Sequence, residues 1–114
     1  MSERSGELLV EDMLEAVDRI QTYTRSIDLA AFMEDDMKVD AVLRNLQVLG
    51  EAAGRVPLEV REQFPEIEWS RIVRSRHIVV HHYFGVDHEI IWRIIEVHLP
   101  PLREQLLRMR EALG

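Results

Sequence analysis

Residues 36–53, which read DMKVDAVLRNLQVLGEAA, decide the fold class because their apolar side chains recur at helical spacing. Three or four residues separate the apolar positions, which are Val39, Val42, Leu43, Leu46, Leu49 and Ala53. That spacing places them on one face of an α-helix. Asp35 or Asp36 can cap the start of this helix, and Gly54 suits its end. Gly50, inside the helix, indicates that another backbone approaches closely there.

The segment before this helix has the same periodicity. In residues 7–25 the apolar positions again recur every three or four residues, and they include Leu9, Met13, Val17 and Ile20. This pattern predicts a second amphipathic helix. Residues 26–33 are typical of a turn followed by a short helical piece, which Asp28 can cap.

Helical patterns continue after residue 53. Pro57 can start a short helix over residues 58–63, and a longer helix is predicted from Trp69 to Tyr83. Gly85 can supply the turn that ends it. Each β-branched pair in this half of the chain lies within a helical pattern, so no strand is predicted.

The last part of the chain also predicts helix. Asp87 can cap a helix over residues 88–98, and Pro100 with Pro101 must break or kink it before a final helical segment. No repeat or interdomain linker interrupts the sequence. We therefore expect an all-α protein, a single antiparallel helical bundle of four to five helices that forms one domain over residues 1–114.

Composition narrows the class of function. The chain has 114 residues, a formal net charge of -7 and no cysteine. The acidic balance argues against broad, non-specific binding to a nucleic-acid backbone, and the lack of cysteine excludes disulfides and thiolate metal sites. The N-terminus lacks a signal-peptide pattern, and no apolar run approaches the ~20 residues that span a bilayer. We expect a cytoplasmic protein without a membrane segment.

One stretch differs from this acidic background. Residues 76–87 read RHIVVHHYFGVD and hold three of the five histidines, with Arg71 and Arg74 just upstream. No acidic residue lies between Trp69 and Val86. Histidine transfers protons near neutral pH, and arginine pairs with phosphate oxygens. These residue types suit metal-independent cleavage of RNA, which carries its own nucleophile, the 2′-hydroxyl.

The geometry of a single helix leaves this site incomplete. Arg76 and His81 are five residues apart, so about 140° separates them on an ideal helix. A long arginine side chain, a distorted helix end or a second copy of the helix would bring them together. The simpler reading is a solvated helix surface with a hydrogen-bonded histidine. His77 and His81 also have the i, i+4 spacing of a helical metal pair, but His82 points about 100° away from His81 and no second shell is evident, so we expect no metal.

The order of several motifs resembles the HEPN superfamily, and within it the HepT branch. The signature is Arg76, four residues, His81, one residue and Tyr83, followed by Phe-Gly-Val-Asp. Further matching segments are Arg44-Asn45-Leu46, Leu49-Gly50-Glu51-Ala52, Phe64-Pro65-Glu66-Ile67 with Trp69, and Leu99-Pro100-Pro101-Leu102. The resemblance covers nearly the whole chain. One departure is His82, where a small residue such as glycine is common in the family.

The resemblance implies a function and a set of roles. HepT-like proteins are helical homodimers whose signature motifs face each other across a cleft. They are toxins of type VII toxin–antitoxin pairs that act as endoribonucleases, with tRNA or mRNA as substrate. Carried over, Arg76 and His81 would be catalytic, His77 the supporting polar residue, and Tyr83 the acceptor of AMP from an MntA-like nucleotidyltransferase antitoxin. No cofactor is implied.

A second reading belongs to a different class of function. Some HEPN domains cleave nothing and bind a nucleotidyltransferase or a nucleotide instead, and the acidic composition is compatible with that role. Outside the signature, Trp69 and Trp92 are interpreted as packing anchors. Arg44, Asn45 and Glu51 fit either a support for the cleft or an ordinary network between packed helices.

Overall fold

The helix of residues 36–53 is the centre of the structure, a computed structural model that describes residues 5–77 and 87–114. It is α3 (Asp36–Arg55), and it begins at Asp35, whose carboxylate accepts a hydrogen bond of 3.0 Å from the backbone N–H of Lys38. The predicted apolar face is buried. Periodicity and capping therefore placed this helix correctly.

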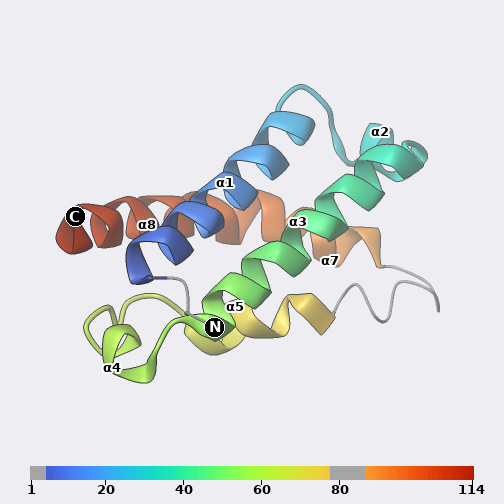
Figure 1. Ribbon diagram of the computed structural model, residues 1–114. Helices are drawn as coiled ribbons and strands as arrows, with labels where there is room; N and C mark the ends of the chain where they lie inside the picture. Colours follow the sequence, from blue (N-terminus) through green and yellow to red (C-terminus); the bar gives the residue numbers. More distant parts are fainter. Residues whose placement is uncertain (1–4, 78–86) are drawn as a thin grey trace.

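The long helix α1 (Gly6–Thr24) packs against each of the other two long helices, α3 and α8 (Leu99–Leu113). α1 runs antiparallel to α3 and packs against it along its length (Figure 1). α8 also packs against α1. Their facing sides form an aliphatic core whose most deeply buried members include Leu9, Met13, Ile20, Leu46, Leu49, Leu99, Leu106 and Met109.

Short helices close the ends of this bundle. α2 (Leu29–Glu34) begins at Asp28, whose carboxylate accepts from the backbone N–H of Ala31 at 2.9 Å, as predicted. α2 contacts α7 (His88–Arg93), and Phe32 packs there against the ring of Trp92, with 5.3 Å between ring centroids. Asp87 caps α7 by accepting from the backbone N–H groups of Glu89 and Ile90, which confirms another prediction.

The end of α3 differs from its prediction. Gly54 lies inside the helix, which continues to Arg55, and Val56 follows in an extended conformation with φ -68° and ψ 124°. The cause is Pro57, because proline disfavours the helical region for the residue before it. The proline, and not the glycine, therefore ends α3. The short helix that follows, α4 (Leu58–Arg61), is two residues shorter than predicted.

The two consecutive prolines also act differently from the prediction. No loop residue separates α7, a π-helical turn η2 (Ile94–His98) and α8, and the prolines occupy the first turn of α8. Proline nitrogen cannot donate a hydrogen bond, and the first turn of a helix has no intrahelical use for those donors. The backbone N–H of Leu99 bonds instead to the carbonyl of Ile94, five residues back. A change of hydrogen-bond pattern thus replaces the expected break.

No strand occurs within residues 5–77 and 87–114, so the all-α prediction is confirmed for the part of the chain that the structure describes. In those same ranges, no helix combines the length and the apolar character that crossing a membrane requires.

The side chain of Arg61 donates hydrogen bonds to the C-terminal end of α3, so its removal should destabilise the fold. Its guanidinium donates to the carbonyls of Val56 at 2.9 Å and of Ala53 and Gly54 at 3.1 Å each, and it lies 5.9 Å from the ring centroid of Trp69. A charge-assisted hydrogen bond contributes about 1.5 kcal/mol or more, but Arg61 is only partly buried and water can replace part of its contacts. We therefore expect Arg61→Ala to lower the free energy of unfolding by about 2 kcal/mol in total.

Urea denaturation followed by circular dichroism measures this loss. Arg108→Ala is the matched control, because Arg108 is exposed on α8 and makes no hydrogen bond or ion pair with the described residues. Equal unfolding midpoints for the two variants would contradict the role assigned to Arg61.

Candidate active site

Arg76 is positioned by a close approach between two backbones. A Cβ atom placed on Gly50 of α3 would lie 3.0 Å from the backbone nitrogen of Arg76 and 3.1 Å from both its Cβ and the carbonyl oxygen of Ile72. Contacts of 3.0–3.1 Å are tighter than nine in ten real Cβ contacts, so any residue other than glycine would require the backbone at Arg76 to shift by a few tenths of an ångström. The prediction that Gly50 marks a backbone contact is confirmed, and the neighbour is the chain that carries Arg76.

Ser75 interrupts the helix that was predicted to run from Trp69 to Tyr83. α5 (Trp69–Arg74) ends at Ser75, whose hydroxyl lies 2.6 Å from the carbonyl oxygen of Ile72 and 3.1 Å from that of Leu46 on α3. A serine that bonds to a preceding carbonyl competes with the helical pattern and bends the chain. Arg76 and His77 are helical again after this turn. Ser75 and Gly50 thus fix the backbone of Arg76 on two sides.

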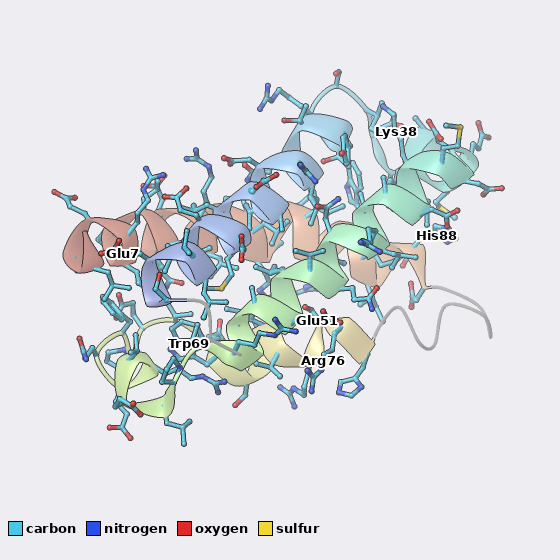
Figure 2. All side chains as sticks on the ribbon, in the orientation of Figure 1. Glu7, Lys38, Glu51, Trp69, Arg76 and His88 are labelled. Atoms are coloured by element: carbon cyan, nitrogen blue, oxygen red, sulfur yellow. The ribbon has the colours of Figure 1, made fainter. Side chains whose placement is uncertain are left out.

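The guanidinium of Arg76 extends along α3 and reaches solvent. Nη1 would lie 3.6 Å from a Cβ placed on Gly54, one helical turn beyond Gly50. The side chain makes no hydrogen bond or ion pair with any residue in the described ranges, and the residue is exposed. Figure 2 shows Arg76 beneath α3, on the side of the molecule where Glu51 is also labelled. A fixed arginine with unused donors is suited to receive a phosphate.

The remaining signature residues divide into two groups. His77 follows Arg76 directly and is also exposed. His81, His82 and Tyr83 lie outside the described residues, so the structure does not test the predicted pairing of Arg76 with His81 or the predicted place of Tyr83. Within residues 5–77 and 87–114, no group of three or more His, Cys, Asp or Glu side chains is arranged to hold a metal ion.

The three polar residues of α3 for which two roles were considered differ in burial. Asn45 is buried, and its amide donates to the carbonyl of Ala41 at 2.9 Å, which is an ordinary packing role. Arg44 and Glu51 are exposed, and the carboxylate of Glu51 accepts a hydrogen bond of 3.4 Å from Gln47. Glu51 therefore remains a charged group on the same helix as the two glycines that adjoin Arg76.

A cavity that the sequence did not reveal lies between α3, α5, η2 and α8. It has a volume of about 400 Å³. Its lining is mostly apolar, and its polar side chains include Arg71, Arg74 and His98. Nη1 of Arg71 lies 3.0 Å from Nδ1 of His98, the last residue of η2. In the sequence, only the basic character of the segment that contains Arg71 and Arg74 indicated this cavity, because residues 71 and 98 are far apart.

Gly54 was also missed as part of the site. Gly54 was predicted to end α3, whereas it lies inside the helix next to the guanidinium of Arg76. Its spacing of four residues from Gly50 was the available signal, since two glycines one turn apart form a groove that a neighbouring chain can enter. The two tryptophans have the expected packing roles, and Trp69 Nε1 donates to the carbonyl of Phe64 at 3.1 Å.

Comparison with known proteins identifies the family of this chain. A model of the family described as ribonuclease HepT-like matches residues 13–109. A Thermococcus cleftensis protein named "Probable ribonuclease HepT" is 33% identical over 108 residues, which cover 95% of this chain and 98% of that protein. A Methanocaldococcus jannaschii protein whose name proposes an RNase is 32% identical over 106 residues, covering 93% and 97% of the two chains. No solved structure matches the chain. The protein therefore belongs to the HepT-like family of the HEPN superfamily.

Proposed function

We propose that this protein is a metal-independent endoribonuclease whose catalytic residues are Arg76 and His81, with His77 in support. The observation that carries the proposal is the placement of Arg76. Its backbone is held against α3 at Gly50, and its guanidinium is exposed and unpaired among the described residues. The membership of the chain in the HepT-like family supports an RNA phosphate as the ligand of this guanidinium.

The chemistry follows from the groups that this site and RNA supply. The 2′-hydroxyl oxygen attacks the neighbouring phosphorus, and its proton passes to a histidine acting as general base. Negative charge builds on the phosphate oxygens, and Arg76 stabilises it. The bond to the 5′-oxygen then breaks, and that oxygen takes a proton from a protonated imidazole. The products are a 2′,3′-cyclic phosphate and a 5′-hydroxyl end, and the protein needs no external reactant.

Metal removal provides the direct test of this activity. We expect the purified protein to cleave single-stranded RNA at the same rate with and without EDTA, because no step in the proposed chemistry uses a metal. Mass spectrometry should find cyclic phosphate ends, and a 2′-O-methyl substrate should resist cleavage. Activity that EDTA abolishes would contradict the proposal.

Two copies of the chain are part of this proposal. About 140° separates Arg76 from His81 on one ideal helix, so a site shared between two protomers solves the geometric difficulty. The exposed side chains of Ile90 and Val97 are a further reason to expect that two copies associate. They are seven residues apart on α7 and η2, and they are 56% and 52% exposed, although both are large and apolar. Covering such side chains favours association.

The biological role that we infer is that of a cytoplasmic toxin, controlled by an MntA-like nucleotidyltransferase that transfers AMP to Tyr83. An AMP group at the motif would place negative charge and bulk where the RNA phosphate should bind. Incubation with such a nucleotidyltransferase and ATP should therefore add the mass of AMP and stop RNA cleavage.

The Tyr83→Phe variant isolates the acceptor in that experiment. It should gain no mass and should continue to cleave RNA in the presence of the nucleotidyltransferase and ATP. AMP found on another residue of this variant, with cleavage inhibited as before, would refute the assignment of Tyr83.

The acidic composition favours a second candidate function. A chain with a formal net charge of -7 has a net repulsion for the nucleic-acid backbone. A non-catalytic module that binds a nucleotidyltransferase or a nucleotide would have no need of RNA. RNA decay that is equal for wild type and for an Arg76/His81 double variant would support this second function.

A further inference from the structure

The cavity between α3, α5, η2 and α8 combines an apolar floor with a cationic rim. Buried side chains of Leu46, Leu49, Ile72, Leu99 and Leu102 form the floor. Its volume of about 400 Å³ falls within the range of small-molecule sites, which is roughly 300–1,000 Å³. Such a floor favours binding of a flat, weakly polar group, because that group is removed from contact with water when it binds.

The two arginines at the cavity differ in whether their guanidinium groups already have hydrogen-bond or ion-pair partners among the described residues. Arg71 pairs with Glu68 at 3.4 Å and lies 3.0 Å from Nδ1 of His98. Because arginine can only donate, His98 accepts through Nδ1 and carries its proton on Nε2. Arg74, by contrast, has no hydrogen bond or ion pair with any residue in the described part of the chain. Arg74 is thus the cation at this cavity that is available to an anion.

The cavity adjoins the candidate active site through the chain itself. Arg74 precedes Arg76 by two residues, which span at most about 7 Å of backbone. Ser75, between them, lines the cavity and also bonds to α3. An RNA strand whose phosphate contacts Arg76 would therefore need to extend only a short distance further to reach Arg74.

We propose that this cavity is a nucleotide subsite for single-stranded RNA, an inference that rests on the proposed ribonuclease function. An unstacked base enters the apolar floor, and a phosphate next to it pairs with Arg74. Gln105 adds a hydrogen-bond acceptor for the base edge, since its amide nitrogen donates to the carbonyl of Glu66 at 3.1 Å and its oxygen has no partner among the described residues. The subsite fixes which nucleotide lies beside the cleaved bond.

RNA is the occupant that the charges favour. Two arginines, Arg71 and Arg74, outnumber the one carboxylate, Glu68, among the residues that line the cavity, although the chain as a whole is acidic. A base with its phosphate satisfies both the apolar floor and the free guanidinium, whereas an apolar helix would satisfy the floor and leave Arg74 unpaired. Proteins that recognise single-stranded RNA commonly hold splayed bases on apolar or guanidinium surfaces in this way.

The test measures binding of a fluorescent single-stranded RNA to the His81→Ala protein, in which cleavage is expected to be blocked. Adding Arg74→Ala should weaken binding about tenfold, as expected for the loss of a charge-assisted phosphate contact. The matched control, Arg108→Ala, removes the same charge from an exposed position on α8 and should leave the affinity nearly unchanged. Equal affinities for these two variants would overturn the subsite.

A second pair of variants tests the floor. Ile94→Trp fills the cavity and should weaken RNA binding about tenfold. The control Leu58→Trp adds the same ring on α4, away from the cavity, where Leu58 is 67% exposed, and should leave RNA binding unchanged. An RNA with an abasic nucleotide at the bound position should bind both variants equally well. If Ile94→Trp instead leaves RNA binding intact and changes the mass of the assembly in light scattering, a second copy occupies the cavity and the proposal is wrong.

Failure of the subsite and failure of the ribonuclease function give different results. If wild-type protein cleaves RNA and the Arg74→Ala and Ile94→Trp variants cleave every sequence with unchanged KM, the function stands and the subsite is refuted. If wild-type protein binds RNA through Arg74 and the cavity but cleaves nothing, the subsite stands and the ribonuclease function is refuted.

Discussion

Arg76→Ala is expected to lower the rate of RNA cleavage by about a hundredfold to a thousandfold, the usual cost of losing one donor that stabilises transition-state charge. The backbone of Arg76, and not its guanidinium, contacts α3 at Gly50, and the side chain makes no hydrogen bond or ion pair with the described residues. Truncation should therefore leave the fold and its stability nearly unchanged while it removes the activity.

His81→Ala should reduce cleavage by about a hundredfold to ten-thousandfold, because it removes a proton-transfer group. Initial rates on a labelled RNA, with unfolding midpoints measured in parallel, separate chemistry from stability. In cells, expression of the wild-type protein should slow growth, and either variant should relieve that effect. Arg108→Ala is the charge-matched control and should retain full activity.

Mixing the two inactive variants asks whether each site is shared between protomers. If Arg76 of one copy acts with His81 of the other, each mixed dimer contains one complete site and one empty site. Random exchange makes half of the dimers mixed, so about a quarter of wild-type activity should return. No recovery in an exchanged sample would show that Arg76 and His81 act within one chain. Full activity in either single variant would contradict the proposed mechanism itself.

The second large effect is expected at Gly50. A valine there would place its Cβ 3.0 Å from the backbone nitrogen of Arg76 and add two methyl groups in the same space. Backbone atoms cannot yield as a flexible side chain does, so overpacking should lower the free energy of unfolding by about 2–3 kcal/mol. The displaced turn at Ser75 would also carry Arg76 away from its position. Chemical denaturation and cleavage rates on the same sample measure both losses.

Gly54→Ala provides the matched control for Gly50→Val. A Cβ on Gly54 would meet Nη1 of Arg76 at 3.6 Å, which is an ordinary contact, and the position lies within α3. Alanine has the higher helix propensity, so stability should rise by up to about 1 kcal/mol. Equal stabilities for Gly50→Val and Gly54→Ala would mean that the close approach at Gly50 does not constrain the Arg76 segment.

The sequence predicted the long helices well because their signals are local. Apolar residues at steps of three and four defined α1 and α3, and Asp28, Asp35 and Asp87 capped helices as expected. The errors arose where one signal competes with another. Gly54 resembles a helix end, yet the restriction that Pro57 places on Val56 decides where α3 stops. The paired prolines resemble a break, yet a π-turn and a helix start accommodate them.

The candidate site was predictable only in part, for a different physical reason. The residue types in the stretch around Arg76 indicated phosphate chemistry, and Gly50 indicated a backbone contact without naming its neighbour. The turn at Ser75 depends on the carbonyl of Leu46, which is 29 residues away in the sequence. The contact between Arg71 and His98 spans 27 residues. Tertiary contacts of this kind follow from packing of whole helices, which no local spacing encodes.

The backbone contact at Gly50 has a consequence for how this protein evolves. Because the scaffold does not rest on the Arg76 side chain, a single codon change can remove the catalytic cation without unfolding the chain. Inactive copies should therefore arise easily and persist as folded proteins. If two copies share each site as proposed above, a dimer of such a copy with an active one would keep one complete site. The loss of the cation would then be masked in a cell that carries both genes, and an inactive gene could spread before its effect is exposed.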